Sequence, residues 1–201
     1  MANKKDLIHF FTFMIEHHFQ DYVVRLYNEY SYNPDSADNA MHYRKHHFGA
    51  ESQGSTTSQV GVKILKGDIE IDNCIILAAG GATTVHRSYT LIDNDRLVSC
   101  CGDSVFCFEL PILNLLWAVR ADLATCFQIF KSENNYIIHG ELLVTSLNEN
   151  GQINWQFGGA DIFVSNGGHE AFIMDSDGII LTDFAGTKYR IDFIGQLLWR
   201  A

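Results

Sequence analysis

A repeat marked by three tryptophans constrains the fold of this chain more than any other feature. The tryptophans are separated by 38 and 44 residues, and they are Trp117, Trp155 and Trp199. Each ends a hairpin-like segment, FELPILNLLW, TSLNENGQINW or RIDFIGQLLW, with Asn114, Gly151 or Gly195 three or four residues before the tryptophan. Asn and Gly tolerate the positive φ that a tight hairpin turn requires. The sequence therefore predicts a structural repeat in which each tryptophan anchors one unit.

The segments upstream of the tryptophan hairpins extend this repeat to four strands. TLIDNDRLVSCC, QIFKSENNYIIHG and FIMDSDGIILTD each contain an apolar strand, a polar turn and a second apolar strand. The units then span about residues 88–119, 124–157 and 171–200. A period near forty residues with four short strands is typical of β-propeller blades. We therefore expect an all-β fold of tandem four-stranded antiparallel units, with the three tryptophans mostly buried at matching positions.

One of these units also carries a family resemblance. The segment GIILTDFAGTKYRIDFIGQLLW resembles a blade of the quinoprotein-like propellers, in which G-x-φ-x-W closes a hairpin, where φ is apolar. The resemblance extends over about residues 88–200 and implies three propeller-like units. A closed propeller usually has at least four blades. Three units therefore leave the ring incomplete.

The last unit lacks a segment that the other two have. The first two units continue past their tryptophans, whereas the third reaches Ala201 two residues after Trp199, so the edge of its last strand is expected to need another partner. An uncovered strand edge presents unpaired backbone groups. Residues 62–79 contain two strand-like runs, VKIL and CIILA. We expect this segment to pair with or pack beside the last unit, so that the two ends of the β-domain meet. The alternative is a homodimer in which a second copy covers the edge.

The N-terminal part is expected to be helical, because residues 6–30 place apolar side chains at spacings of three and four. These side chains are Ile8, Phe11, Ile15, Phe19, Tyr22 and Leu26. A polar stretch rich in small residues follows and is typical of a linker. The predicted organisation is an N-terminal helical arm with its linker over residues 1–58 and a β-repeat domain over residues 59–201.

The cysteines and the N-terminus together favour a cytoplasmic location. The five cysteines are odd in number, lack CxxC spacing and lie mostly in apolar strand-like runs, so buried free thiols without a disulfide are expected. The first apolar run is interrupted by Asp6, His9 and Thr12 and lacks a small-x-small cleavage site, which argues against a signal peptide. It is also too short and too polar to span a membrane.

The net charge narrows the class of partner. The chain carries a formal charge of −10, and residues 59–201 hold 9 basic and 17 acidic side chains. Such a field repels nucleic acid and anionic lipid and speeds the encounter with a basic protein. We therefore expect a protein partner, with the charge favouring a basic one, rather than nucleic acid or a membrane.

Two histidines occupy equivalent repeat positions, His86 in HRSYTL and His169 in HEAFIM. With Asp122 or Asp161 they could form a metal or acid–base site at a blade rim, as in a metal-dependent hydrolase or lyase. The favoured interpretation is that both histidines inherit a turn position from the repeat, with no catalytic, metal-binding or cofactor-binding residue. His139 lies within a predicted strand and is expected to be a hydrogen-bonded interior residue.

A second resemblance bears on function. The segments CCGDSVFCFELPILNLLWAVRADLATCF and DIFVSNGG resemble uncharacterised bacterial proteins associated with immunity to secreted polymorphic toxins. This resemblance implies a non-catalytic binding protein that neutralises a toxin without a cofactor. The alternative is the metal-dependent enzyme with the histidine-lined rim, and self-association that completes a ring is compatible with either function.

Overall fold

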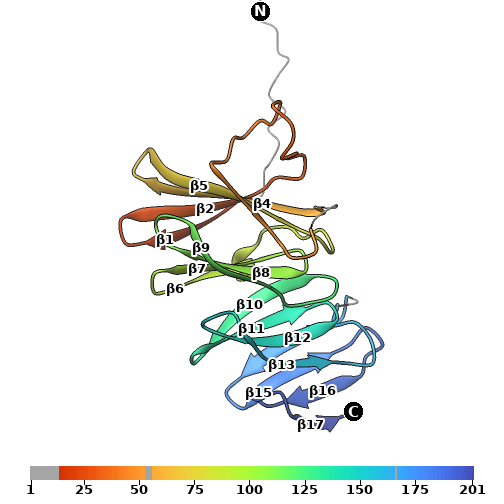
Figure 1. Cartoon of the computed structure of the whole chain (residues 1–201). Coiled ribbons are helices and arrows are strands. Elements are labelled where there is room, and N and C mark those ends of the chain that lie inside the picture. Colours follow the sequence, from red (N-terminus) through yellow and green to blue (C-terminus); the bar gives the residue numbers. More distant parts are fainter. Residues whose placement is uncertain (1–13, 53–55, 166) are drawn as a thin grey trace, which may run out of the picture.

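The computed structural model describes residues 14–52, 56–165 and 167–201. Within these residues the chain forms four sheets that follow one another in chain order as an open stack, and no α-helix is present (Figure 1). None of the described residues forms a helix long and apolar enough to cross a membrane. The expected all-β class of tandem four-stranded antiparallel units is confirmed, whereas the N-terminal helical arm is not.

The N-terminal sheet has the strand order β1-β2-β4-β5-β3, and β3 is parallel to β5 while the other pairs are antiparallel. Its strands are β1 (Met14–Phe19), β2 (Tyr22–Asn28), β3 (Lys45–Phe48), β4 (Ser58–Lys66) and β5 (Ile69–Ala78). This one sheet contains strands from both sides of residue 58, where the sequence analysis placed a boundary. Residues 29–44 cross its outer face, where Tyr32 and Tyr43 pack on Ile75 and Leu77.

The predicted helix over residues 6–30 is wrong for residues 14–28, which form the β1–β2 hairpin; residues 6–13 lie outside the described residues. The reason is that a spacing of four residues fits both the helical period of about 3.6 and the strand period of about 2. Ile15 and Phe19 in β1, and Tyr22 and Leu26 in β2, also share a strand face because four is an even number. The hairpin pairs Phe19 with Tyr22 and Ile15 with Leu26, and all four side chains pack against the core.

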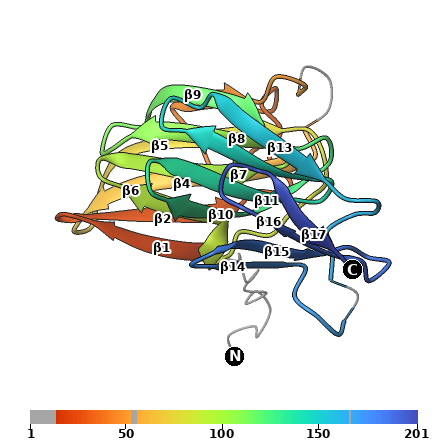
Figure 2. The same cartoon turned by 90° about the horizontal axis from the view of Figure 1, so that it is seen from below.

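The three repeat sheets are antiparallel meanders, preceded by a short 3-10 helix, η1 (Arg87–Tyr89). The first contains β6 (Thr90–Asp93), β7 (Arg96–Cys101), β8 (Ser104–Glu109) and β9 (Asn114–Arg120). The second contains β10 (Cys126–Ser132), β11 (Asn135–Gly140), β12 (Leu143–Asn148) and β13 (Ile153–Gly158). The third contains β14 (Phe172–Asp175), β15 (Gly178–Thr182), β16 (Lys188–Ile191) and β17 (Leu197–Arg200). The edge strands of the three repeat sheets are β6 and β9, β10 and β13, and β14 and β17; in the view from below, β1 and β14 lie at the lower side of the stack and β9 at the upper side (Figure 2).

The tryptophans occupy matching positions, as the repeat predicts. Each lies in the fourth strand of its sheet, beside a register shift that marks a β-bulge. Their partners on the third strand are Cys107 for Trp117, Ser146 for Trp155 and Arg190 for Trp199.

Two of the tryptophans connect one repeat sheet to the next. The Trp117 indole Nε1–H donates to the Glu149 carbonyl at 3.0 Å, and the Trp155 Nε1–H donates to the Phe193 carbonyl at 3.0 Å. Both carbonyls belong to hairpin turns of the following sheet. Trp117 and Trp155 are partly buried, but Trp199 is 43% exposed, so its expected burial is wrong.

The turn glycines have two roles: they adopt the positive φ of the turn, and their lack of a Cβ lets the tryptophan ring approach the backbone. Gly151 has φ +75 and Gly195 has φ +81, and a Cβ at these positions would lie 2.5 Å from the Trp117 ring and 2.6 Å from the Trp155 ring. In the first repeat sheet the residue four places before the tryptophan is Leu113, which has φ +45 and a fully buried side chain. The positive φ there falls on Leu113 rather than on Asn114, which begins β9.

The expected meeting of residues 62–79 with the last unit is also wrong. These residues lie in β4 and β5, which pair with β2 and β3 and contact β7 of the first repeat sheet. The third repeat sheet lies at the opposite end of the stack (Figure 1). Because residues 14–28 form strands instead of a helix, β2 supplies the pairing partner that β4 requires. The propeller-like stack is therefore open, without a closed ring.

All five cysteines lie in strands and are buried as free thiols, as their apolar surroundings predict. Burial raises the pKa of each thiol because the thiolate would lose its hydration. They form part of the main core, which joins the N-terminal sheet to the first and second repeat sheets.

The tryptophan contact predicts that Gly151→Ala destabilises the protein more than Gly67→Ala does. Gly67 has φ +59 with no atom within 4 Å of the added Cβ, so its substitution carries only the backbone cost of about 1–2 kcal/mol. At Gly151 the collision with Trp117 adds roughly 2 kcal/mol. Urea unfolding of both variants measures the difference, and equal losses would contradict the role assigned to the contact.

Candidate functional site

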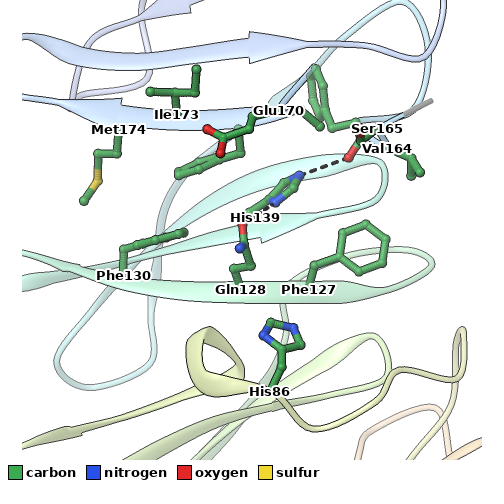
Figure 3. Close-up of a pocket in the computed structure, with 13 residues that line it drawn as sticks. His86, Phe127, Gln128, Phe130, His139, Val164, Ser165, Glu170, Ile173 and Met174 are labelled. Carbon is green, nitrogen blue, oxygen red and sulfur yellow. Dashed lines mark hydrogen bonds between the residues drawn. The ribbon is translucent and has the colours of Figure 1, made fainter. Parts of the chain in front are cut away.

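A groove of about 670 Å³ opens between the second and third repeat sheets (Figure 3). Its walls come from β10, β11, β14 and the segment that precedes β14, and His86 contributes from the residue before η1. Most of the lining is apolar, because the first strands of neighbouring sheets direct aromatic side chains toward each other. The lining residues with aromatic rings are His86, Phe127, Phe130, His139, Phe163 and Phe172.

Stacked rings stabilise the wall of this groove. Phe172 from β14 stacks on Phe130 from β10 with centroids 4.9 Å apart and planes at 10°. Phe172 also stacks on His139, at 5.0 Å and 21°, and Phe127 meets His139 edge-on at 5.5 Å. Because offset and edge-on ring pairs are favourable geometries, the wall is a packed aromatic layer shared by the two sheets.

His139 is the buried polar group of the groove, with 6% of its surface exposed. Its Nε2 lies 3.0 Å from the Phe163 carbonyl and its Nδ1 lies 3.0 Å from the Gln128 side chain. Burial lowers the pKa of His139 to about 4, because the charged ring would lose its hydration. The prediction of a hydrogen-bonded interior histidine is confirmed.

The neutral state of His139 fixes its tautomer. A carbonyl can only accept, so the proton resides on Nε2 and is donated to Phe163. Nδ1 must then accept, which requires the Gln128 amide to turn its NH₂ group toward the ring. Both ring nitrogens are therefore engaged in holding the second repeat sheet to the segment before β14.

The histidines predicted for a rim site lie in different settings. His86 is exposed and lines the groove, with its ring 5.7 Å from that of Tyr89. His169 does not line the groove, although its neighbour Glu170 does. The His169 carbonyl accepts the Ser165 hydroxyl at 2.5 Å, so its main chain closes the turn before β14.

The two predicted aspartates bond to the backbone. Asp122 is 1% exposed; its Oδ1 accepts the N–H groups of Ala124 and Thr125, and its Oδ2 accepts those of Leu142 and Leu143, at 2.6–3.1 Å. It therefore ties the segment after β9 to the β11–β12 turn. Asp161 is exposed and accepts the N–H of Ile162 at 2.8 Å. Across the described ranges, no group of three or more His, Cys, Asp or Glu side chains could hold a metal ion.

Sequence reasoning placed three of the groove's phenylalanines, Phe127, Phe130 and Phe172, within predicted repeat units and gave them no further role. Phe127 and Phe130 belong to TCFQIFKS, and Phe172 belongs to HEAFIMD. The available signal was that the first strand of each of these two units carries phenylalanine beside a polar residue. That pattern does not predict that the first strands of two neighbouring units line the same groove.

Comparison with known proteins concerns the fold. No protein-family model and no curated protein matches the chain. Among solved structures, it is similar to the computationally designed protein Ika8, with 13% identity, a TM-score of 0.51 and coverage of 92% of this chain and 48% of that chain. It is also similar to the AfRom2 CNH domain, with 10% identity, a TM-score of 0.50 and coverage of 94% and 54%.

A third similar structure is BamB from Moraxella catarrhalis, with 14% identity, a TM-score of 0.48 and coverage of 70% of this chain and 43% of that chain. The chain therefore spans about half the length of these proteins. The repeated four-stranded sheets and the similarity to the AfRom2 CNH domain support a β-propeller-like repeat architecture.

The neutral, buried His139 predicts that the protein loses stability on acidification. In the unfolded chain His139 has its ordinary pKa of 6.5, whereas in the folded protein its pKa is about 4. Between these two pH values the unfolded chain binds a proton that the folded protein does not. The contribution of His139 is thus complete above pH 6.5 and falls by about 3 kcal/mol as the pH approaches 4. Chemical unfolding at a series of pH values measures this loss.

His139→Gln removes the titrating imidazole, and the glutamine amide can still donate a hydrogen bond to the Phe163 carbonyl. The stability of this variant should therefore depend less on pH between about 4 and 6.5. His42→Gln changes an exposed histidine and is the control, for which the wild-type slope is expected. If both variants keep the wild-type slope, the assignment to His139 is wrong.

Proposed function

We propose that the protein is a non-catalytic protein-binding module whose groove between the second and third repeat sheets receives an apolar side chain of its partner. The observation that carries the proposal is the chemistry of the groove. Its wall is aromatic, and its buried histidine is uncharged with both nitrogens engaged. Such a cavity favours an apolar group with few polar contacts at its rim.

Charge supports a basic partner. The chain carries a formal charge of −10, and the exposed carboxylate of Glu170 lies at the rim of the groove. Complementary charge raises the association rate and disfavours acidic competitors. We therefore expect the partner to surround its apolar contact with Lys or Arg side chains.

The more specific proposal is a cytoplasmic immunity protein that neutralises a toxin by binding it. Its support is the sequence resemblance described above, carried by CCGDSVFCFELPILNLLWAVRADLATCF and DIFVSNGG. The second of these segments includes Phe163, Val164 and Ser165, which line the groove. Because the resembling segment contributes to the groove wall, the resemblance supports a function in which the toxin binds at the groove.

The test begins with partners captured from the native cell and continues with each purified partner. Glu170→Lys should weaken binding of the true partner about tenfold, because the rim then repels its basic surface. Asp68→Lys makes the same charge change in the exposed β4–β5 turn, and less than a threefold effect is expected from it. Isothermal titration at two salt concentrations measures both variants.

Equal effects of the two substitutions would show that only net charge matters and would contradict the role of the groove. For the immunity proposal, co-expression of the captured partner should stop growth, and wild-type protein should restore it. Glu170→Lys should restore growth less well than Asp68→Lys. A partner that is harmless to the cell would contradict toxin immunity while leaving protein binding intact.

A further inference from the structure

The outer face of the third repeat sheet has the same layout as the faces by which the preceding sheets pack. In each sheet one side chain from every strand forms a row that ends at the tryptophan. The rows are Leu91, Val98, Cys107 and Trp117; Phe130, Ile137, Ser146 and Trp155; and Ile173, Ile180, Arg190 and Trp199. We call the last of these the Trp199 row.

The first two rows are covered by the sheet that follows. A turn of that sheet places a left-handed glycine flat on the indole ring, and the carbonyl two residues before the glycine accepts the indole N–H. In the Trp199 row, Trp199 is 43% exposed and Ile173 is 41% exposed. Within residues 14–52, 56–165 and 167–201, no turn takes the equivalent place on Trp199.

The Trp199 row differs from the covered rows at its third position. Cys107 and Ser146 are small and buried, whereas the third row has Arg190. Two guanidinium nitrogens of Arg190 bond the Asp175 carboxylate at 3.1 and 2.7 Å, and 16% of the side chain is exposed. Tryptophan and arginine are among the residue types enriched where protein–protein binding energy is concentrated. The row therefore contains two side chains suited to binding another protein.

A second copy of the chain is a poor occupant of this face. The outer face of the N-terminal sheet is covered by Tyr32 and Tyr43, so it cannot serve as the next sheet in a head-to-tail stack. In a face-to-face dimer each copy would carry a formal charge of −10. Like charges of this size oppose self-association.

We propose that the Trp199 row is a docking surface for a different β-sheet protein that presents a hairpin turn. The turn places a glycine with positive φ on the Trp199 indole, and the carbonyl two residues earlier accepts the Trp199 Nε1–H. The two internal contacts define this recognition, because Trp117 and Trp155 bind their turns in the same way. Ile173 of this row also lines the groove, so the two surfaces adjoin, but recognition of a turn by Trp199 does not depend on the function proposed for the groove.

A cyclic peptide tests the proposal with the full chain. The probe is a backbone-cyclised hairpin that carries the turn Asp-Phe-Ile-Gly-Gln of residues 192–196, since an isolated linear hairpin is marginally stable in water. The protein is labelled with ¹⁵N at tryptophan, so that its spectrum contains three indole signals. Trp199→Phe identifies the signal of Trp199, and the exposure of this side chain makes loss of folding unexpected.

The expected result is a saturable shift of the Trp199 signal alone, with at least a tenfold weaker affinity for a control peptide in which valine replaces the glycine. A signal that stays in place at millimolar peptide, or an equal response to both peptides, would overturn the proposal. A shift that depends on protein concentration without peptide would identify a second copy as the occupant and would also overturn it.

Discussion

The contact between a tryptophan and the glycine turn of the next sheet is the interaction on which the repeat stack depends. It combines an indole hydrogen bond of 3.0 Å with a ring surface that only a residue without Cβ can approach. The bulge beside each tryptophan fixes its position relative to the strand register. A turn, a bulge and an aromatic ring thus act as one unit that sets the order and spacing of the sheets.

This interaction gives the stack a direction and makes its two ends different. Trp117 and Trp155 each extend toward the sheet that follows them in the chain. At the first end the N-terminal sheet is capped by the tyrosines of residues 29–44. At the other end the Trp199 row presents an indole to solvent, beside an Arg190 side chain that is 16% exposed and paired with Asp175. The same contact therefore holds the interior together and leaves the proposed docking surface at one end.

The groove and the Trp199 row offer two kinds of recognition on one scaffold. The groove is a concave site between sheets whose polar centre, His139, is already satisfied by Phe163 and Gln128. The Trp199 row is a sheet face whose Trp199 indole N–H has no turn to bond within the described residues. On the two proposals together, the scaffold binds two regions of one partner, and the formal charge of −10 favours a basic one.

The sequence by itself determined the units: strand period, turn glycines and tryptophan spacing are local properties, and they correctly predicted three four-stranded sheets with matching tryptophans. It also identified His139 as an interior residue. Local pattern could not decide whether Ile15, Phe19, Tyr22 and Leu26 belong to a helix or a hairpin, because a spacing of four suits both, and only pairing with β4 settled it. Tertiary structure alone decided that β10 and β14 border one groove and that Trp199 lacks the turn that covers Trp117 and Trp155. Those outcomes depend on which sheets become neighbours, and burial and hydrogen bonding between distant segments decide that.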